Sequence, residues 1–141
     1  MPSHLKTARW TVRNFPRPND CVSRVLVVDD YRPGAEAVSA SLTVAGYEVR
    51  LVLDGVAALQ TVRSWLPHIA LLDINMPGMD GYAVARRLRG EVLTQHTIIV
   101  AFTALDEPTA RLSGMDSGFD AYCQKDAAPG HLLRLLERLA H

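Results

Sequence analysis

Short, uninterrupted apolar runs constrain the fold of this chain more than any other feature of its sequence. Such a run, without alternation, is typical of a strand that is buried on both faces of a parallel sheet. Runs of this kind lie at residues 25–28, 69–72, 98–102 and 121–123. Another run, at residues 49–53, is interrupted by Arg50, which favours a strand at the edge of the sheet.

Segments with helical spacing of apolar residues separate these runs. They lie at residues 35–45, 58–65, 84–90, 108–115 and 132–139. Strands that alternate with helices in this way predict a doubly wound α/β sandwich around a parallel sheet. Right-handed crossovers between parallel strands leave few topologies. The flavodoxin-like (βα)5 arrangement with strand order 2-1-3-4-5 is a common one for five such units, and we expect it here.

Residues 1–23 lack this regular pattern. They contain prolines and several basic residues but no sustained hydrophobic period. We therefore predict a flexible N-terminal arm at residues 1–23 and one folded domain at residues 24–141. The apolar side chains of the arm, Trp10 among them, leave open the alternative that it docks on the domain or on a partner.

The composition excludes several classes of function. The 15 Lys and Arg residues balance 15 Asp and Glu residues, so charge gives no reason to expect nucleic acid or an anionic membrane as a partner. The two cysteines, Cys21 and Cys123, are too few for a disulfide framework. The sequence has no apolar run long enough to cross a bilayer and no signal-peptide pattern. We expect a cytoplasmic protein.

Polar side chains follow the predicted strands at the points where those strands end. Asp29 and Asp30 come directly after the first run, Asp73 follows the third, Thr103 ends the fourth and Lys125 follows the fifth. The carboxyl ends of parallel strands meet at one edge of the sheet, where doubly wound folds place their sites. One acidic residue after a strand is often only a helix cap, but capping does not explain the whole set.

These side chains suit one kind of chemistry. Three converging carboxylates repel one another unless a hard divalent cation is bound, and oxygen ligands suit Mg²⁺, with Mn²⁺ as a substitute. With the cation bound, one carboxylate can attack a phosphorus atom. Asp73 is the best candidate for this nucleophile because it ends the central strand. Lys125 and Thr103 complete a cradle for the phosphoryl oxygens.

Four segments around these residues resemble a known family. They read Val-Leu-Val-Val-Asp-Asp (25–30), Leu-Leu-Asp-Ile-Asn-Met-Pro-Gly-Met-Asp-Gly (71–81), Phe-Thr-Ala (102–104) and Tyr-Cys-Gln-Lys (122–125). In this order and at this spacing they closely resemble the receiver domains of two-component response regulators. The resemblance covers residues 24–141 and predicts a stand-alone receiver, similar to the C-terminal receivers of hybrid sensor histidine kinases.

The resemblance implies a phosphorelay function and a role for each site residue. Asp73 would accept a phosphoryl group from a sensor histidine kinase or a histidine phosphotransfer protein. The domain would catalyse only its own phosphorylation and dephosphorylation, so it would not be an enzyme in the usual sense. Asp30, Asp73 and the backbone carbonyl of Asn75 would bind Mg²⁺, and Asp29 would act through water. Lys125 would pair first with Asp73 and then with the phosphoryl group.

The resemblance also implies a conformational switch. Thr103 would move to hydrogen-bond a phosphoryl oxygen, and Tyr122 would turn inward behind it. This movement would change the surface formed by the fourth helix, fifth strand and fifth helix. Members of the family use that surface to bind a downstream protein or to form a homodimer. A core aromatic that never moves is the alternative interpretation of Tyr122.

Two positions depart from the family pattern or vary within it. Asp126 stands where receivers usually have a proline, often with a cis peptide bond; a cis bond before another residue costs about 3 kcal/mol. We therefore expect a trans bond, and we hypothesise slower phosphorylation or weaker coupling. The family counterpart of Leu105 lies with Asn75 at the mouth of the site. An apolar side chain there would hinder water and lengthen the phosphorylated lifetime.

Two alternatives belong to other functional classes. A receiver-like interaction module that acts without phosphorylation would not react with small-molecule phosphoryl donors. A Mg²⁺-dependent phosphohydrolase of the haloacid dehalogenase type would need a second carboxylate as general acid and base. Asn75 occupies that position and cannot shuttle a proton.

Overall fold

The central sheet carries the site, and its topology agrees with the sequence. The computed structural model describes residues 5–13 and 23–139 of the chain. Within this part the strands are ordered β1-β6-β5-β4-β2-β3 across one sheet. Their bounds are β1 Thr7–Arg9, β2 Arg24–Val28, β3 Glu48–Val52, β4 Ile69–Leu72, β5 Ile98–Thr103 and β6 Ala121–Gln124. The five neighbouring strands β3, β2, β4, β5 and β6 pair in parallel. They are the five predicted strands in the order 2-1-3-4-5, so that prediction is confirmed.

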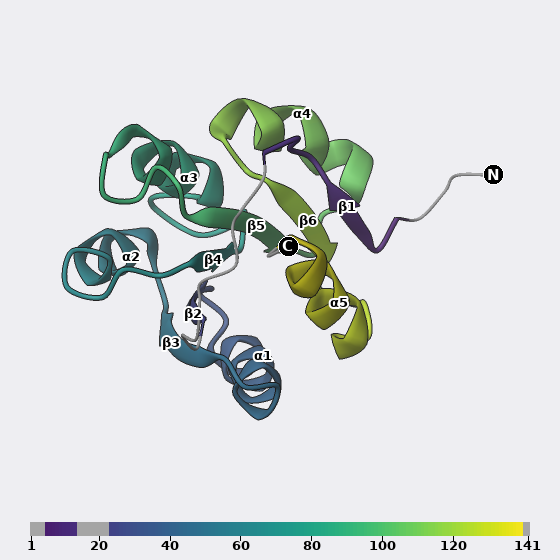
Figure 1. Cartoon of the computed structure of the whole chain (residues 1–141). Helices are drawn as coiled ribbons and strands as arrows, with labels where there is room; N and C mark the ends of the chain where they lie inside the picture. Colours follow the sequence, from purple (N-terminus) through teal and green to yellow (C-terminus); the bar gives the residue numbers. More distant parts are fainter. Residues whose placement is uncertain (1–4, 14–22, 140–141) are drawn as a thin grey trace.

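The helices cover both faces of this sheet (Figure 1). Their bounds are α1 Arg32–Val44, α2 Gly55–Thr61, α3 Gly81–Gly90, α4 Glu107–Ser117 and α5 Pro129–Leu139. Side chains of α1 and α5 pack with one face, and those of α2, α3 and α4 pack with the other. In the part of the chain that the structure describes, no helix has the length and apolarity needed to cross a membrane.

The core explains why the strands have continuous apolar sequences. Successive side chains of a strand point to opposite faces of a sheet, and here both faces are covered by helices. Val28 and Leu72 lie in the cluster beneath α2, α3 and α4, whereas Val27 and Leu71 lie in the cluster beneath α1 and α5. All four are at most 1% exposed. Polar residues are therefore left to the ends of the strands, where the site lies.

Arg50 lies on the edge strand β3, as its position in the sequence predicts. Its guanidinium carbon is 5.0 Å from the ring centroid of Trp65. This cation–π contact lets the guanidinium stay in water while its stem covers an apolar side chain.

The prediction of a flexible arm is wrong for residues 5–13. Thr7–Arg9 form β1, which pairs antiparallel with β6 and adds an outer strand to the predicted sheet. The side chain of Trp10 is half-buried against the core cluster of α4. β1 is held by hydrogen bonds to β6 and by the packing of Ala8 and Trp10 against this cluster, so it needs no apolar period of its own. Residues 1–4 and 14–22, the remainder of the predicted arm, lie outside the described part.

Candidate functional site

The backbone ties the ends of neighbouring strands together at the carboxyl edge of the sheet. The N–H of Asp73 donates to the carbonyl of Val28 at 2.9 Å, which anchors the end of β4 beside β2. The N–H of Lys125 donates to the carbonyl of Thr103 at 2.9 Å, which does the same for β6 and β5. The strand ends that the sequence predicts to be neighbours are therefore neighbours in the fold.

Three carboxylates converge at this edge. One ligand oxygen from each of Asp29, Asp30 and Asp73 lies within 4.8 Å of the others. Asp29 and Asp73 are buried, at 2% and 6% exposed, and Asp30 is exposed. Oδ2 of Asp29 is buried and faces the ammonium group of Lys125. A cluster of hard oxygen ligands that is open to solvent on one side fits a divalent cation that retains water ligands.

Lys125 is the cation that the structure places in this cluster. Its Nζ lies 2.6 Å from Oδ2 of Asp29 and 2.9 Å from Oδ2 of Asp73, and its side chain is 25% exposed. The ammonium group therefore bridges the two buried carboxylates. Sequence reasoning paired Lys125 with Asp73 but missed its contact with Asp29, because an order of residues along strands does not give side-chain directions.

The pKa values of Asp73 and Lys125 are both raised in this cluster, for different reasons. Burial raises the pKa of Asp73, and the hydrogen bond and charge of Lys125 only partly offset this effect. Burial alone would lower the pKa of Lys125, but the hydrogen bonds and charges of Asp29 and Asp73 outweigh it and leave that pKa raised. Lys125 is thus held as an ammonium ion, whereas burial, with a smaller contribution from the charge of Asp29, disfavours the ionised form of Asp73.

Thr103 and Tyr122 lie behind the carboxylates and are linked through one loop residue. Thr103 is fully buried, and its Oγ1 accepts a hydrogen bond from the N–H of Leu105 at 3.3 Å. The hydroxyl of Tyr122 donates to the carbonyl of the same Leu105 at 2.6 Å, and its side chain is 0% exposed. The inward position that the resemblance associates with phosphorylation is therefore the position of Tyr122 in this structure.

The remaining predicted residues line the rim of the site. Asn75 is exposed in the loop after β4, and its backbone lowers the pKa of Asp73 by hydrogen bonding. The peptide bond between Lys125 and Asp126 is trans, as expected without proline. Gly81 begins α3 directly against the backbone of Asp73, where a Cβ atom would collide with the carbonyl oxygen. Asp80 caps that helix by accepting from Ala83 N at 2.9 Å.

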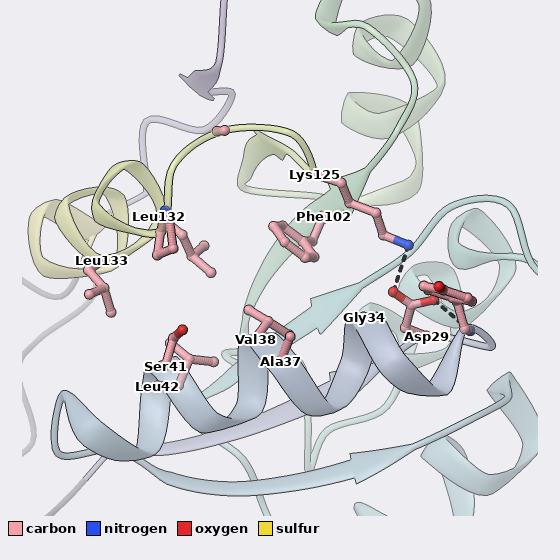
Figure 2. Close-up of a pocket in the computed structure, with 13 residues that line it drawn as sticks. Asp29, Gly34, Ala37, Val38, Ser41, Leu42, Phe102, Lys125, Leu132 and Leu133 are labelled. Carbon is pink, nitrogen blue, oxygen red and sulfur yellow. Dashed lines mark hydrogen bonds and ion pairs between the residues drawn. The ribbon is translucent and has the colours of Figure 1, made fainter.

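An apolar pocket of about 350 Å³ opens beside the carboxylates, between α1 and α5. Figure 2 shows Asp29 and Lys125 at one end of it and Leu132 and Leu133 at the other, with Val38 of α1 between them. A molecule that reaches Asp73 from this side would contact apolar surface next to the charged cluster.

Several residues near the site carry no sequence signal of their role. Trp10 donates from its indole Nε1 to Oε2 of Glu107 at 2.9 Å, and Lys6 pairs with Asp126 at 3.1 Å. Glu107 is 2% exposed although it lies in the first turn of a helix, where an acidic residue is ordinarily solvated. Only the apolar side chains of the otherwise irregular segment, Trp10 among them, pointed towards docking.

Comparison with known proteins agrees with this geometry. Residues 25–137 match the family described as the response regulator receiver domain. The chain is 42% identical over 103 residues to the response regulator PleD of Caulobacter vibrioides, a match that covers 73% of this chain and 23% of PleD. It is 40% identical over 116 residues to the response regulator MprA of Mycobacterium tuberculosis, covering 82% of this chain and 50% of MprA. The chain therefore spans half or less of the length of these relatives.

Solved structures show the same fold. A putative response regulator from Chloroflexus aurantiacus superposes with a TM-score of 0.81 at 32% identity, over 85% of this chain and 98% of that one. The matched residues include the whole carboxylate cluster and Lys125. The chain belongs to the response regulator receiver domain family, a family of phosphoacceptor domains in two-component signalling, and a receiver domain is not in itself a classical enzyme.

Proposed function

We propose that Asp73 is the phosphoacceptor of this receiver domain and that Lys125 is its main positive partner. The observation that carries the proposal is the ammonium group of Lys125, which bridges the buried carboxylates of Asp29 and Asp73 at 2.6 and 2.9 Å. Asp73 is the carboxylate at the end of the central strand β4. Burial raises the pKa of Asp73, and perturbed carboxyls are common at functional sites.

The reaction would be an in-line displacement. One Oδ of Asp73 attacks the phosphorus of a phosphohistidine donor, the P–N bond breaks, and the imidazole leaves with the bonding electron pair. The product is an acyl phosphate on Asp73. Lys125 would then move its charge from the carboxylate to a phosphoryl oxygen, and the Thr103 hydroxyl would donate to another.

Asp30, Asp73 and the backbone carbonyl of Asn75 would hold Mg²⁺, with Mn²⁺ as a substitute and Asp29 acting through water. The oxygen donor set and the open side at Asp30 support this assignment. When bound, the cation supplies positive charge to the transferring oxygens. Without it, Lys125 would be the only cation in contact with the described carboxylates of the cluster.

The donor would be a sensor histidine kinase or a histidine phosphotransfer protein in the cytoplasm. The output would pass through the surface of α4, β6 and α5, on which residues 5–13 already lie, to a downstream protein or a second copy of the chain. The domain would comprise residues 24–141, with residues 5–13 added to its sheet. The neutral formal charge of the chain supports a protein partner over nucleic acid.

Intact-mass spectrometry after incubation with acetyl phosphate or phosphoramidate tests the function. We expect one phosphoryl adduct that requires Mg²⁺ and is absent from Asp73→Asn. Asp116→Asn makes the same chemical change at a carboxylate that is 81% exposed on α4 and should be phosphorylated like the wild type. Failure to form the adduct under all conditions would favour an interaction module that acts without phosphorylation.

Asp126 gives this proposal a further test. Its carboxylate adds negative charge beside Lys125, and we hypothesise that it slows phosphorylation or weakens coupling to the protein-binding surface. Lys6 offsets part of that charge at 3.1 Å. Asp126→Pro should therefore accept the phosphoryl group faster from the same donor. A wild-type rate typical of receivers that does not change in this variant would refute the hypothesis.

A further inference from the structure

The outer edge of β6 is occupied by a segment of the same chain. Thr7, Ala8 and Arg9 pair with Cys123, Tyr122 and Ala121, in that order. The ladder continues at both ends: Gln124 N–H donates to the carbonyl of Lys6 at 2.7 Å, and Trp10 N–H donates to the carbonyl of Asp120 at 2.8 Å. Without residues 5–13, β6 would be an edge strand with open hydrogen-bonding groups. This edge is therefore a binding site for an extended strand.

The side chain of Trp10 occupies a surface site on this edge, which we call the α4 seat and which Glu107, Gly114, Phe119 and Tyr122 form. The indole stacks on the ring of Tyr122, with 5.5 Å between centroids and 26° between planes. It meets Phe119 edge to face at 6.5 Å. Its Nε1–H donates to Glu107 at 2.9 Å. A Cβ atom at Gly114 would collide with the indole ring, so a larger residue on α4 would close the seat.

The buried carboxylate of Glu107 in this seat has hydrogen-bond donors that stabilise its negative charge. Glu107 is 2% exposed and accepts hydrogen bonds from Arg111, of which one measures 2.8 Å, and from the indole of Trp10. The hydrogen bond from Arg111 is the main reason that the pKa of Glu107 is lowered; burial opposes it, and the bond from Trp10 adds to it. The carboxylate therefore stays ionised as an acceptor that points at the indole N–H.

Trp10 holds Tyr122 in its inward position. The ring of Tyr122 is covered by the indole, and its hydroxyl is held by the carbonyl of Leu105 at 2.6 Å. The N–H of Leu105 donates in turn to Oγ1 of Thr103. Outward rotation of the Tyr122 ring would require Trp10 to leave its seat. The docked segment is thus connected to the phosphoryl cradle through two hydrogen bonds of one loop residue.

The hydrogen bonds indicate whether docking of residues 5–13 favours or opposes phosphorylation of Asp73. A Thr103 hydroxyl that donates to a phosphoryl oxygen becomes a better acceptor for Leu105 N–H, because hydrogen bonds in a chain polarise one another. That contact fixes the backbone of Leu105, whose carbonyl holds Tyr122 under Trp10. At the other end of the segment, Lys6 places positive charge 3.1 Å from Asp126, next to Lys125. Both effects favour added negative charge at Asp73 while the segment is docked.

We propose that residues 5–13 are a built-in ligand of the β6 edge and the α4 seat, and that their docking and the phosphorylation of Asp73 favour each other. The proposal rests on the assignment of Asp73 as phosphoacceptor. Coupling between two sites is reciprocal. Phosphorylation therefore tightens the docking of the segment, and release of the segment makes phosphorylation less favourable by the same factor.

Hydrogen exchange of the full-length chain, followed by mass spectrometry, tests whether phosphorylation tightens the docking of residues 5–13. Amides of residues 7–10 are measured in Mg²⁺ alone and after saturation with beryllofluoride, a phosphoryl mimic. We expect exchange to slow by roughly fivefold or more, the lower end of typical coupling between sites. Unchanged or faster exchange on a fully occupied site would overturn the proposal and leave the phosphoacceptor function intact.

Variants that displace Trp10 from the α4 seat test whether release of residues 5–13 makes phosphorylation of Asp73 less favourable. Gly114→Ala should release Trp10 without removing any contact of the domain itself, and Trp10→Ala should do so from the other side. Each should need severalfold more acetyl phosphate for half-maximal phosphorylation. Gly90→Ala, a helical glycine with open space around it, and Val12→Ala, at a side chain that is 97% exposed, are the matched controls.

The outcomes separate this proposal from the function on which it rests. If both seat variants fold by circular dichroism, expose residues 7–10 to exchange and are phosphorylated like the wild type, the coupling does not exist. If one variant fails to fold, the other decides. If the wild type forms no adduct with any donor, the assignment of Asp73 falls and the coupling falls with it.

Discussion

Removal of the ammonium group of Lys125 should destabilise the metal-free domain strongly and the Mg²⁺-bound domain weakly. Lys125→Met keeps most of the side-chain stem and deletes the charge. It leaves the carboxylates of Asp29 and Asp73, at 3% and 8% side-chain exposure, without a cation in contact. Bound Mg²⁺ would supply the missing charge at the same cluster.

The expected loss in the free energy of unfolding of Lys125→Met follows from the two contacts of the ammonium group. At an effective dielectric constant of about 20, each contact of Lys125 represents about 6 kcal/mol of gross attraction. Most of this is cancelled by desolvation, and breaking a buried pair costs about 3–5 kcal/mol in practice. Because Lys125 is 25% exposed, we expect about 2–3 kcal/mol. For a domain of this size that corresponds to a Tm lower by about 6–9 °C.

Thermal unfolding by circular dichroism in EDTA and in saturating MgCl₂ measures both values. In Mg²⁺ the loss should fall to about 1 kcal/mol or less, because a ligand that binds only the folded state offsets the missing charge. The matched control is Lys6→Met: Lys6 and Asp126 are 38% and 67% exposed, and an exposed pair contributes about 0–1 kcal/mol whatever the metal. An equal Tm loss with and without Mg²⁺ for Lys125→Met would refute the reasoning.

The other predictions concern the pKa values and the rim of the site. The raised pKa of Asp73 means that its contribution to stability is present below its unfolded pKa and is lost as the pH rises through its folded pKa. Asp73→Asn should therefore be more stable than the wild type in EDTA at neutral pH, by about 1 kcal/mol, and urea unfolding should show the gap closing in acid; a gap that widens in acid contradicts this. Burial raises the pKa of the Cys123 thiol to about 12, so in Cys21→Ser it should resist iodoacetamide until urea unfolds the chain, and rapid alkylation of the native protein would contradict its burial. Leu105→Glu should shorten the phosphorylated lifetime severalfold by admitting water, which the decay of the adduct mass measures; an unchanged decay rate would rule out that role.

The strand ends show how far sequence reasoning reaches. Short continuous apolar runs that alternate with amphipathic segments predict strands of a sheet covered on both faces, and the carboxyl ends of parallel strands share one edge. Asp29, Asp30, Asp73 and Lys125 therefore had to lie near one another once the strands were identified. The directions of their side chains did not follow, which is why the short contact between Lys125 and Asp29 emerged only from the structure.

The N-terminal segment shows where sequence reasoning ends. Thr7–Arg9 form a strand without an apolar period, and Glu107 and Gly114 carry no sign that one accepts from an indole and the other leaves room for it. The seat of Trp10 is assembled from residues about 100 positions away along the chain. Local periodicity reports the burial of a segment in its own element, and it contains no information on a surface built elsewhere.

The sequence by itself predicted the order of the five parallel strands, the edge that carries the site, and the residue types gathered there. Burial imposes fixed periods on strands and helices, and right-handed crossovers leave few strand orders for such units. The tertiary structure alone decided that Tyr122 lies inward beneath Trp10 and that residues 5–13 complete the sheet. Those features depend on the complementary shape and charge of distant segments, and such complementarity exists only after the chain has folded.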